Sequence, residues 1–81
     1  MKKDNLTDQQ LKFIEENRKM ISDRLKTLRK KKHSSAEKFA HENGLNRIQY
    51  ARCESGKHNI SMDYFLMLLS IHGIGMGEFM K

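Results

Sequence analysis

Basic side chains are the most concentrated chemical feature of this 81-residue sequence. Lys and Arg number 16 against 10 Asp and Glu, which gives a formal net charge of +6. Eight of these cations lie in residues 18–32, where Asp23 is the single acid, so this segment carries the whole positive surplus. Clustered Lys and Arg bind polyanions, because they displace the counterions condensed on phosphate backbones. The same pattern also fits a solvated helix face or a basic helix lying on an anionic membrane.

Side chains suited to metal binding or catalysis form no such cluster. Cys53 is the one cysteine, so an internal disulfide is excluded, which fits a reducing cytoplasm. Its position one helical turn from Tyr50 predicts a packed, inert thiol. The histidines fall on separate predicted elements without paired ligand spacing: His33, His41, His58 and His72. We therefore expect no metal site, no cofactor and no enzymatic activity.

The length of the chain limits what kind of site it can build. A domain of this size buries only roughly 60 to 65% of its unfolded surface. A deep pocket for a small-molecule ligand is therefore not expected, whereas a surface that binds a partner is. No apolar run approaches the about 18 residues of a membrane span, so we expect no membrane partner and a cytoplasmic location.

Hydrophobic periodicity predicts an all-α chain that begins with a long apolar stripe. Thr7 and Gln10 have the spacing of a capping box at the start of a helix. Arg18 interrupts the stripe, which indicates either a hinge or a point where the stripe leaves the core. The sequence leaves open whether this region is one long helix or two helices joined near Asn17 and Arg18. No Pro or Gly separates them, and we favour two helices, near residues 7–18 and 19–31. The stripe recurs at helical steps through Leu11, Ile14, Ile21, Leu25 and Leu28.

Two short helices are predicted in the middle of the chain. Ser34 and Ser35 offer an N-cap for the first, which Gly44 ends. Asn46 caps the second, which covers residues 47–55. Two short helices joined by a Gly-containing turn are typical of the helix-turn-helix unit, in which the first helix braces the second and the second enters the major groove of DNA.

The last third of the sequence predicts two further helices. Ser61 is the N-cap of a strongly apolar helix that Gly73 ends. Residues 74–79 are expected to form a final turn or a short helix, which Gly75 and Gly77 weaken.

The chain is similar to a known family in this region. Residues 21–79 resemble the lambda-repressor-like, or xenobiotic-response-element (XRE), helix-turn-helix domain. The resemblance implies a compact five-helix bundle with an extra N-terminal helix, divided into a partly helical extension (1–20) and a DNA-binding domain (21–81). The matching stretches are Ile21-Ser22-Asp23-Arg24-Leu25-Lys26-Thr27-Leu28-Arg29, Glu37-Lys38-Phe39-Ala40, Gly44-Leu45-Asn46-Arg47, Arg52-Cys53-Glu54-Ser55-Gly56-Lys57 and Asn59-Ile60-Ser61-Met62.

The resemblance also implies which side chains contact DNA. The helix over 46–55 is the recognition helix of such a domain. Arg pairs with guanine, Gln with adenine, and Ile contacts a thymine methyl group. The side chains carried over by position as base contacts are Arg47, Ile48, Gln49 and Arg52. Those expected at phosphates are Ser35, Lys38, Asn46 and Lys57.

Three further positions bear on this resemblance. Arg29 and Glu54 match a family pair that joins the first core helix to the end of the recognition helix, so an ion pair is expected. His33 replaces a usual Gly, so that helix end must be strained or closed differently.

The expected function is a sequence-specific transcriptional regulator that binds double-stranded DNA as a homodimer. The N-terminal helix is a candidate dimer surface through Leu6, Leu11, Phe13 and Ile14, and packing on its own core is the equal alternative. Other interpretations are an antitoxin that represses its own operon, an adaptor that keeps the fold without binding DNA, and a basic helix on an anionic membrane.

Overall fold

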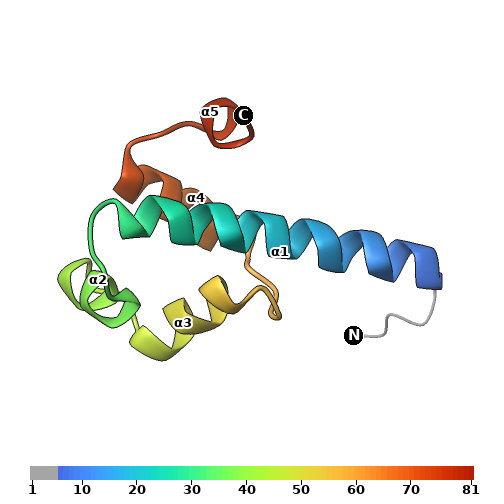
Figure 1. Cartoon of the computed structure of the whole chain (residues 1–81), viewed down its shortest axis with the longest axis horizontal. Coiled ribbons are helices and arrows are strands. Elements are labelled where there is room, and N and C mark those ends of the chain that lie inside the picture. Colours follow the sequence, from blue (N-terminus) through green and yellow to red (C-terminus); the bar gives the residue numbers. More distant parts are fainter. Residues whose placement is uncertain (1–5) are drawn as a thin grey trace.

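Five helices make up the part of the chain that this computed structural model describes, residues 6–81 (Figure 1). No residue in that range lies in a strand, so the prediction of an all-helical chain is confirmed. Residues 1–5 of the predicted extension lie outside the described residues. The helices are α1 (Asp8–Lys30), α2 (Ala36–Glu42), α3 (Arg47–Ser55), α4 (Met62–His72) and α5 (Met76–Phe79).

The first helical region is one helix, because α1 spans 23 residues without a break. Of the two arrangements that the sequence left open, the favoured one with two helices is wrong. The capping box is present, with Thr7 accepting from the Gln10 backbone N–H at 3.0 Å and Gln10 accepting from Thr7 N–H at 2.9 Å. Arg18 marks the point where the apolar stripe leaves the core, because no residue of α1 before Ser22 is buried. Its guanidinium donates to Asn59 Oδ1 at 2.9 Å in the loop before α4.

The core draws one large side chain from every helix. Leu25 of α1, Phe39 of α2, Tyr50 of α3, Leu68 of α4 and Phe79 of α5 are all buried. The ring centroids of Phe39 and Tyr50 lie 5.1 Å apart, so these side chains pack α2 against α3. No residue of α1 before Ser22 is buried, so the C-terminal half of α1 builds the core and the N-terminal half does not.

The turn between α2 and α3 follows the local signals in the sequence. Ser35 accepts from the Lys38 backbone N–H, and Asn46 accepts from the N–H groups of Ile48 and Gln49. Gly44 has φ +69°, a conformation that side-chain-bearing residues rarely adopt, and it lets Leu45 N–H reach the Ala40 carbonyl at 2.8 Å. Two short helices joined by a Gly-containing turn are thus present at residues 36–55, as predicted.

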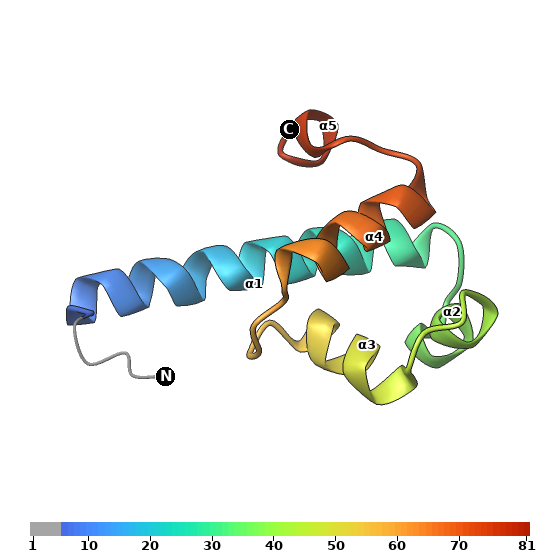
Figure 2. The same cartoon turned by 180° about the vertical axis from the view of Figure 1, so that it is seen from behind.

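The N-terminal half of α1 projects beyond the rest of the molecule (Figures 1 and 2). The radius of gyration is 13.5 Å, above the about 12 Å expected for a globular domain of this length. Within residues 6–81, none of Leu6, Leu11, Phe13 and Ile14 belongs to the core or packs directly against it. Among the described residues no helix combines the length and apolarity needed to cross a bilayer.

Candidate nucleic-acid interface

The outer face of α3 is exposed along its whole length. Arg47, Ile48, Ala51, Arg52 and Ser55 recur at helical spacing, and all five are exposed. Ile48 is 58% exposed, so this face presents one aliphatic side chain among polar ones. Solvent therefore reaches three of the four predicted base-contacting residues on one continuous face.

The inner face of α3 is fixed to the core. Tyr50, Cys53 and Glu54 are buried. The burial of Tyr50 and Cys53 was predicted from their inward positions on the helix. Burial raises the pKa of the Cys53 thiol to about 12, and the nearby Glu54 charge adds to the effect. Cys53 is therefore protonated and shielded, which agrees with the prediction of an inert thiol.

The expected ion pair between Arg29 and Glu54 is confirmed. Arg29 Nη2 lies 2.8 Å from Glu54 Oε1 and Nε lies 3.0 Å from Oε2, so the guanidinium grips the carboxylate with two parallel hydrogen bonds. Each side chain is 6% exposed. Burial by itself raises the pKa of Glu54, but hydrogen bonding and the positive charge of Arg29 outweigh it and hold that pKa below its ordinary value.

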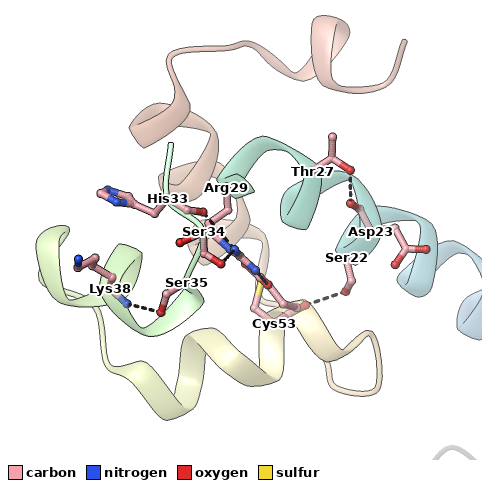
Figure 3. A network of polar contacts seen from close by, with 10 residues as sticks. Ser22, Asp23, Thr27, Arg29, His33, Ser34, Ser35, Lys38 and Cys53 are labelled. Atoms are coloured by element: carbon pink, nitrogen blue, oxygen red, sulfur yellow. Dashed lines mark hydrogen bonds and ion pairs between the residues drawn. The ribbon is translucent and has the colours of Figure 1, made fainter. Parts of the chain in front are cut away.

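Arg29 also closes the end of α1. Its Nη1 donates to the carbonyls of His33 at 3.2 Å and Ser34 at 2.9 Å (Figure 3). The helix end is therefore closed differently from one that has a glycine at this position, and His33 has no positive φ. One guanidinium therefore joins α1, the loop before α2, and the last turn of α3.

A contact that sequence analysis missed secures the same end of α3. The buried Ser22 hydroxyl donates to the Cys53 carbonyl at 2.7 Å (Figure 3). Gly56, at φ +76°, ends α3 beside α1, where an added Cβ would lie 3.4 Å from the Lys19 Cα. A serine within the buried stripe of α1 is the one signal in the sequence that points to this contact.

Much of the basic cluster is used to hold the fold. Arg18 bonds to Asn59, Arg24 donates to the Phe79 carbonyl at 2.7 Å, and Arg29 pairs with Glu54. Lys19 lies 3.4 Å from Asp23 in an exposed pair. Half of the eight cations in residues 18–32 therefore have partners within the chain, and the surplus does not form one free polyanion-binding surface.

A shallow depression gathers several of the predicted DNA contacts. Arg47, Ile48 and Arg52 line it together with Ala36 at the start of α2. Gln49 lies elsewhere, in a neighbouring hollow that also includes Arg52 and the loop residues before α4. The structure thus groups three of the predicted base contacts and sets Gln49 beside them.

The depression also contains an acid that sequence analysis did not select. Glu37 Oε2 accepts from Arg47 Nη1 at 3.2 Å, and both side chains are 69% exposed. The pair joins the first turn of α2 to the first residue of α3. Nothing in the sequence links two residues ten positions apart across a turn, so only the fold brings them together.

The four residues predicted to contact phosphates differ in how far their polar atoms are already used within the fold. Ser35 and Asn46 use their side-chain oxygens to cap α2 and α3, so their polar atoms are partly committed to the fold. Lys38 and Lys57 are exposed. In residues 6–81 no cluster of His, Cys, Asp and Glu is suited to hold a metal ion.

No family model matches this chain, and no curated protein or solved structure matches it.

Proposed function

We propose that this protein is a sequence-specific DNA-binding transcriptional regulator that places α3 in the major groove of double-stranded DNA. The observation that carries this proposal is the division of α3 into two faces. Arg47, Ile48 and Arg52 are exposed on one face, while Cys53 and Glu54 lock the other face to the core. A rigid helix about 10 to 12 Å wide fits a groove about 12 Å wide.

The side chains of the exposed face have the chemistry that base recognition requires. The guanidinium groups of Arg47 and Arg52 can each donate two hydrogen bonds to the O6 and N7 atoms of guanine. Ile48 can contact a thymine methyl group, and Ala51 beside it is small enough to allow close approach. Exposed Lys38 and Lys57 supply charge for phosphates on either side of the recognition helix.

Selection of bound duplexes from a random pool tests the proposal. A preferred sequence with two inverted half-sites about one helical turn apart supports a dimeric regulator. The selected duplex should then bind with a steep dependence of log K on log salt concentration. Equal binding to selected and random duplexes would contradict sequence-specific recognition.

A matched pair of variants separates the recognition face from the rest of the surface. Ile48→Glu places a carboxylate toward the DNA, and we expect it to lower affinity for the selected duplex at least about tenfold through repulsion by phosphates. Leu66→Glu adds the same charge at an exposed apolar residue of α4, outside that face. Because both variants change the net charge equally, Leu66→Glu shows the effect of net charge alone, and its affinity should stay within about twofold of the wild type. Equal losses in both variants would remove α3 from the interface.

One arginine variant and one lysine variant separate base contacts from phosphate contacts. Arg52→Ala should relax the preference at one base pair by about 1 to 3 kcal/mol. Lys57→Ala should weaken all duplexes alike and lower the salt slope by about one.

The exposed Ile48 beside Ala36 also favours a second candidate, an adaptor that binds a protein through the same face. An adaptor should show no preferred duplex and no salt-dependent binding to DNA, which are the two results that decide between the candidates. An antitoxin-type autorepressor would share the DNA-binding behaviour of the first proposal.

A further inference from the structure

An apolar groove runs beside the projecting half of α1. Phe13 and Ile14 form one wall, and Met62 of α4, Met76 of α5 and Met80 just after α5 form the other. Of the seven large apolar side chains that are exposed within residues 6–81, four line this groove. Single exposed apolar residues are ordinary, but a contiguous apolar groove of this kind marks an interaction surface.

The projecting half of α1 has little packing within its own chain. Residues before Ser22 contribute nothing buried to the core, so the first half of α1 is held mainly by its capping box and by Arg18. Isolated helices shorter than about 12 to 15 residues are marginal in water. A second surface that covers the apolar side of this half would supply the missing packing.

We propose that the projecting half of α1 from a second copy of this chain occupies the groove, in an antiparallel dimer with two-fold symmetry. The projecting half of α1 forms one wall of the groove and is also the segment that fills it. Each copy therefore covers the groove of the other with the same segment. A two-fold interface requires that kind of surface, in which residue i contacts residue j of the partner and residue j contacts residue i.

The charge distribution along α1 selects the antiparallel direction. The segment 8–17 carries three acids and one lysine, whereas the segment 18–30 carries five cations and one acid besides Arg29, whose charge is buried against Glu54. An antiparallel pair places the acidic half of each helix beside the basic half of the other. A parallel pair would place like charges together, which is unfavourable.

The position of the groove sets the centre of the pair. Its α1 wall extends from Phe13 to Ile21, so the symmetry axis passes near Asn17. Figures 1 and 2 show α2 and α3 together on one side of α1, with the N-terminal half projecting past them. The interface goes beyond the proposed function and does not depend on it.

Sedimentation equilibrium of the full chain tests the interface. The wild type should be dimeric, and Phe13→Glu should raise the dimer dissociation constant at least about a hundredfold, because two buried phenylalanines are lost per dimer. Phe13 is 66% exposed in the single chain, so this substitution leaves the fold intact, which circular dichroism can verify. Leu66→Glu, which lies outside the groove, should remain dimeric. A monomeric wild type, or a Phe13→Glu protein as dimeric as the wild type, would overturn the proposal.

Cross-linking tests the direction. Asn17→Cys should join to its own copy through a short bismaleimide, since residue 17 lies near the axis. Gln10→Cys should not, because its two copies would be about 21 Å apart along an antiparallel pair. Cross-linking at both positions indicates a parallel pair and overturns the antiparallel arrangement, as does the absence of cross-linking at Asn17→Cys. Buried Cys53 does not compete for the reagent.

The same samples separate this proposal from the proposed function. A monomeric Phe13→Glu protein should still bind a duplex that contains one half-site, at lower affinity. A dimeric wild type that binds no preferred duplex would refute the DNA-binding proposal and leave the interface in place.

Discussion

Removal of the Glu54 carboxylate tests how strongly α3 is held against α1. Glu54→Ala deletes the acceptors at 2.8 and 3.0 Å from Arg29 and leaves a guanidinium with a 6% exposed side chain without its counter-charge. Breaking a buried pair from one side costs about 3 to 5 kcal/mol. Arg29 keeps its bonds to the His33 and Ser34 carbonyls, so we expect the lower end of that range.

A loss of about 3 kcal/mol is a large part of the stability of this chain. At about 0.05 to 0.15 kcal/mol per residue, a domain of this length has about 4 to 12 kcal/mol in total. Urea denaturation followed by circular dichroism measures the change. Lys19→Ala is the control, because it breaks an exposed pair on the same helix and should have little effect.

The pH dependence provides a second measurement on the same pair. The folded-state pKa of Glu54 is depressed, so its contribution is complete above the unfolded value of about 4.3 and is lost as the pH falls through the folded value. Glu54→Gln should therefore lose less stability on acidification than the wild type. The reasoning is refuted if Glu54→Ala costs less than about 1 kcal/mol, or no more than Lys19→Ala.

Three further predictions concern other parts of the fold. Gly44→Ala and Gly56→Ala should each destabilise the protein by about 1 to 2 kcal/mol, because both positions have positive φ, whereas Gly75→Ala at φ −90° in open space should be neutral. Equal effects at all three positions in denaturation experiments would contradict this explanation. Cys53 should react with a thiol reagent only after unfolding, since it is 3% exposed and its pKa is raised to about 12, and rapid labelling of the native protein would contradict its packing. Burial, with a smaller effect of Lys32, lowers the pKa of His72, so stability is complete above the unfolded value of about 6.5 and decreases as the pH falls below it. His72→Phe, which keeps a ring against Phe39, should remove that decrease, and a pH profile identical to the wild type would contradict the assignment.

The candidate site shows where prediction from sequence succeeds and where it stops. The resemblance selected Arg47, Ile48 and Arg52, and the structure exposes them on one face of α3 together with Ala51 and Ser55. The position of Gln49 in a separate hollow and the contact of Glu37 with Arg47 depend on the angle between α2 and α3, which the sequence does not display. The Arg29–Glu54 pair came from the family resemblance and not from any local pattern.

The N-terminal ends of four helices were determined by the sequence itself. Thr7, Ser35, Asn46 and Ser61 each cap a helix through hydrogen bonds to backbone groups two or three residues away. Such contacts form wherever the residues occur in the right order, because they need no other part of the chain.

The tertiary structure alone decided what the basic residues of α1 do. Arg18 and Arg24 bond to groups 41 and 55 residues away, and Ser22 bonds to a carbonyl 31 residues away. A run of cations in a sequence states only how much charge is present. Which cations remain free for a partner depends on the acceptors that folding brings within about 3 Å, and those acceptors come from the loop before α4, from α5 and from α3.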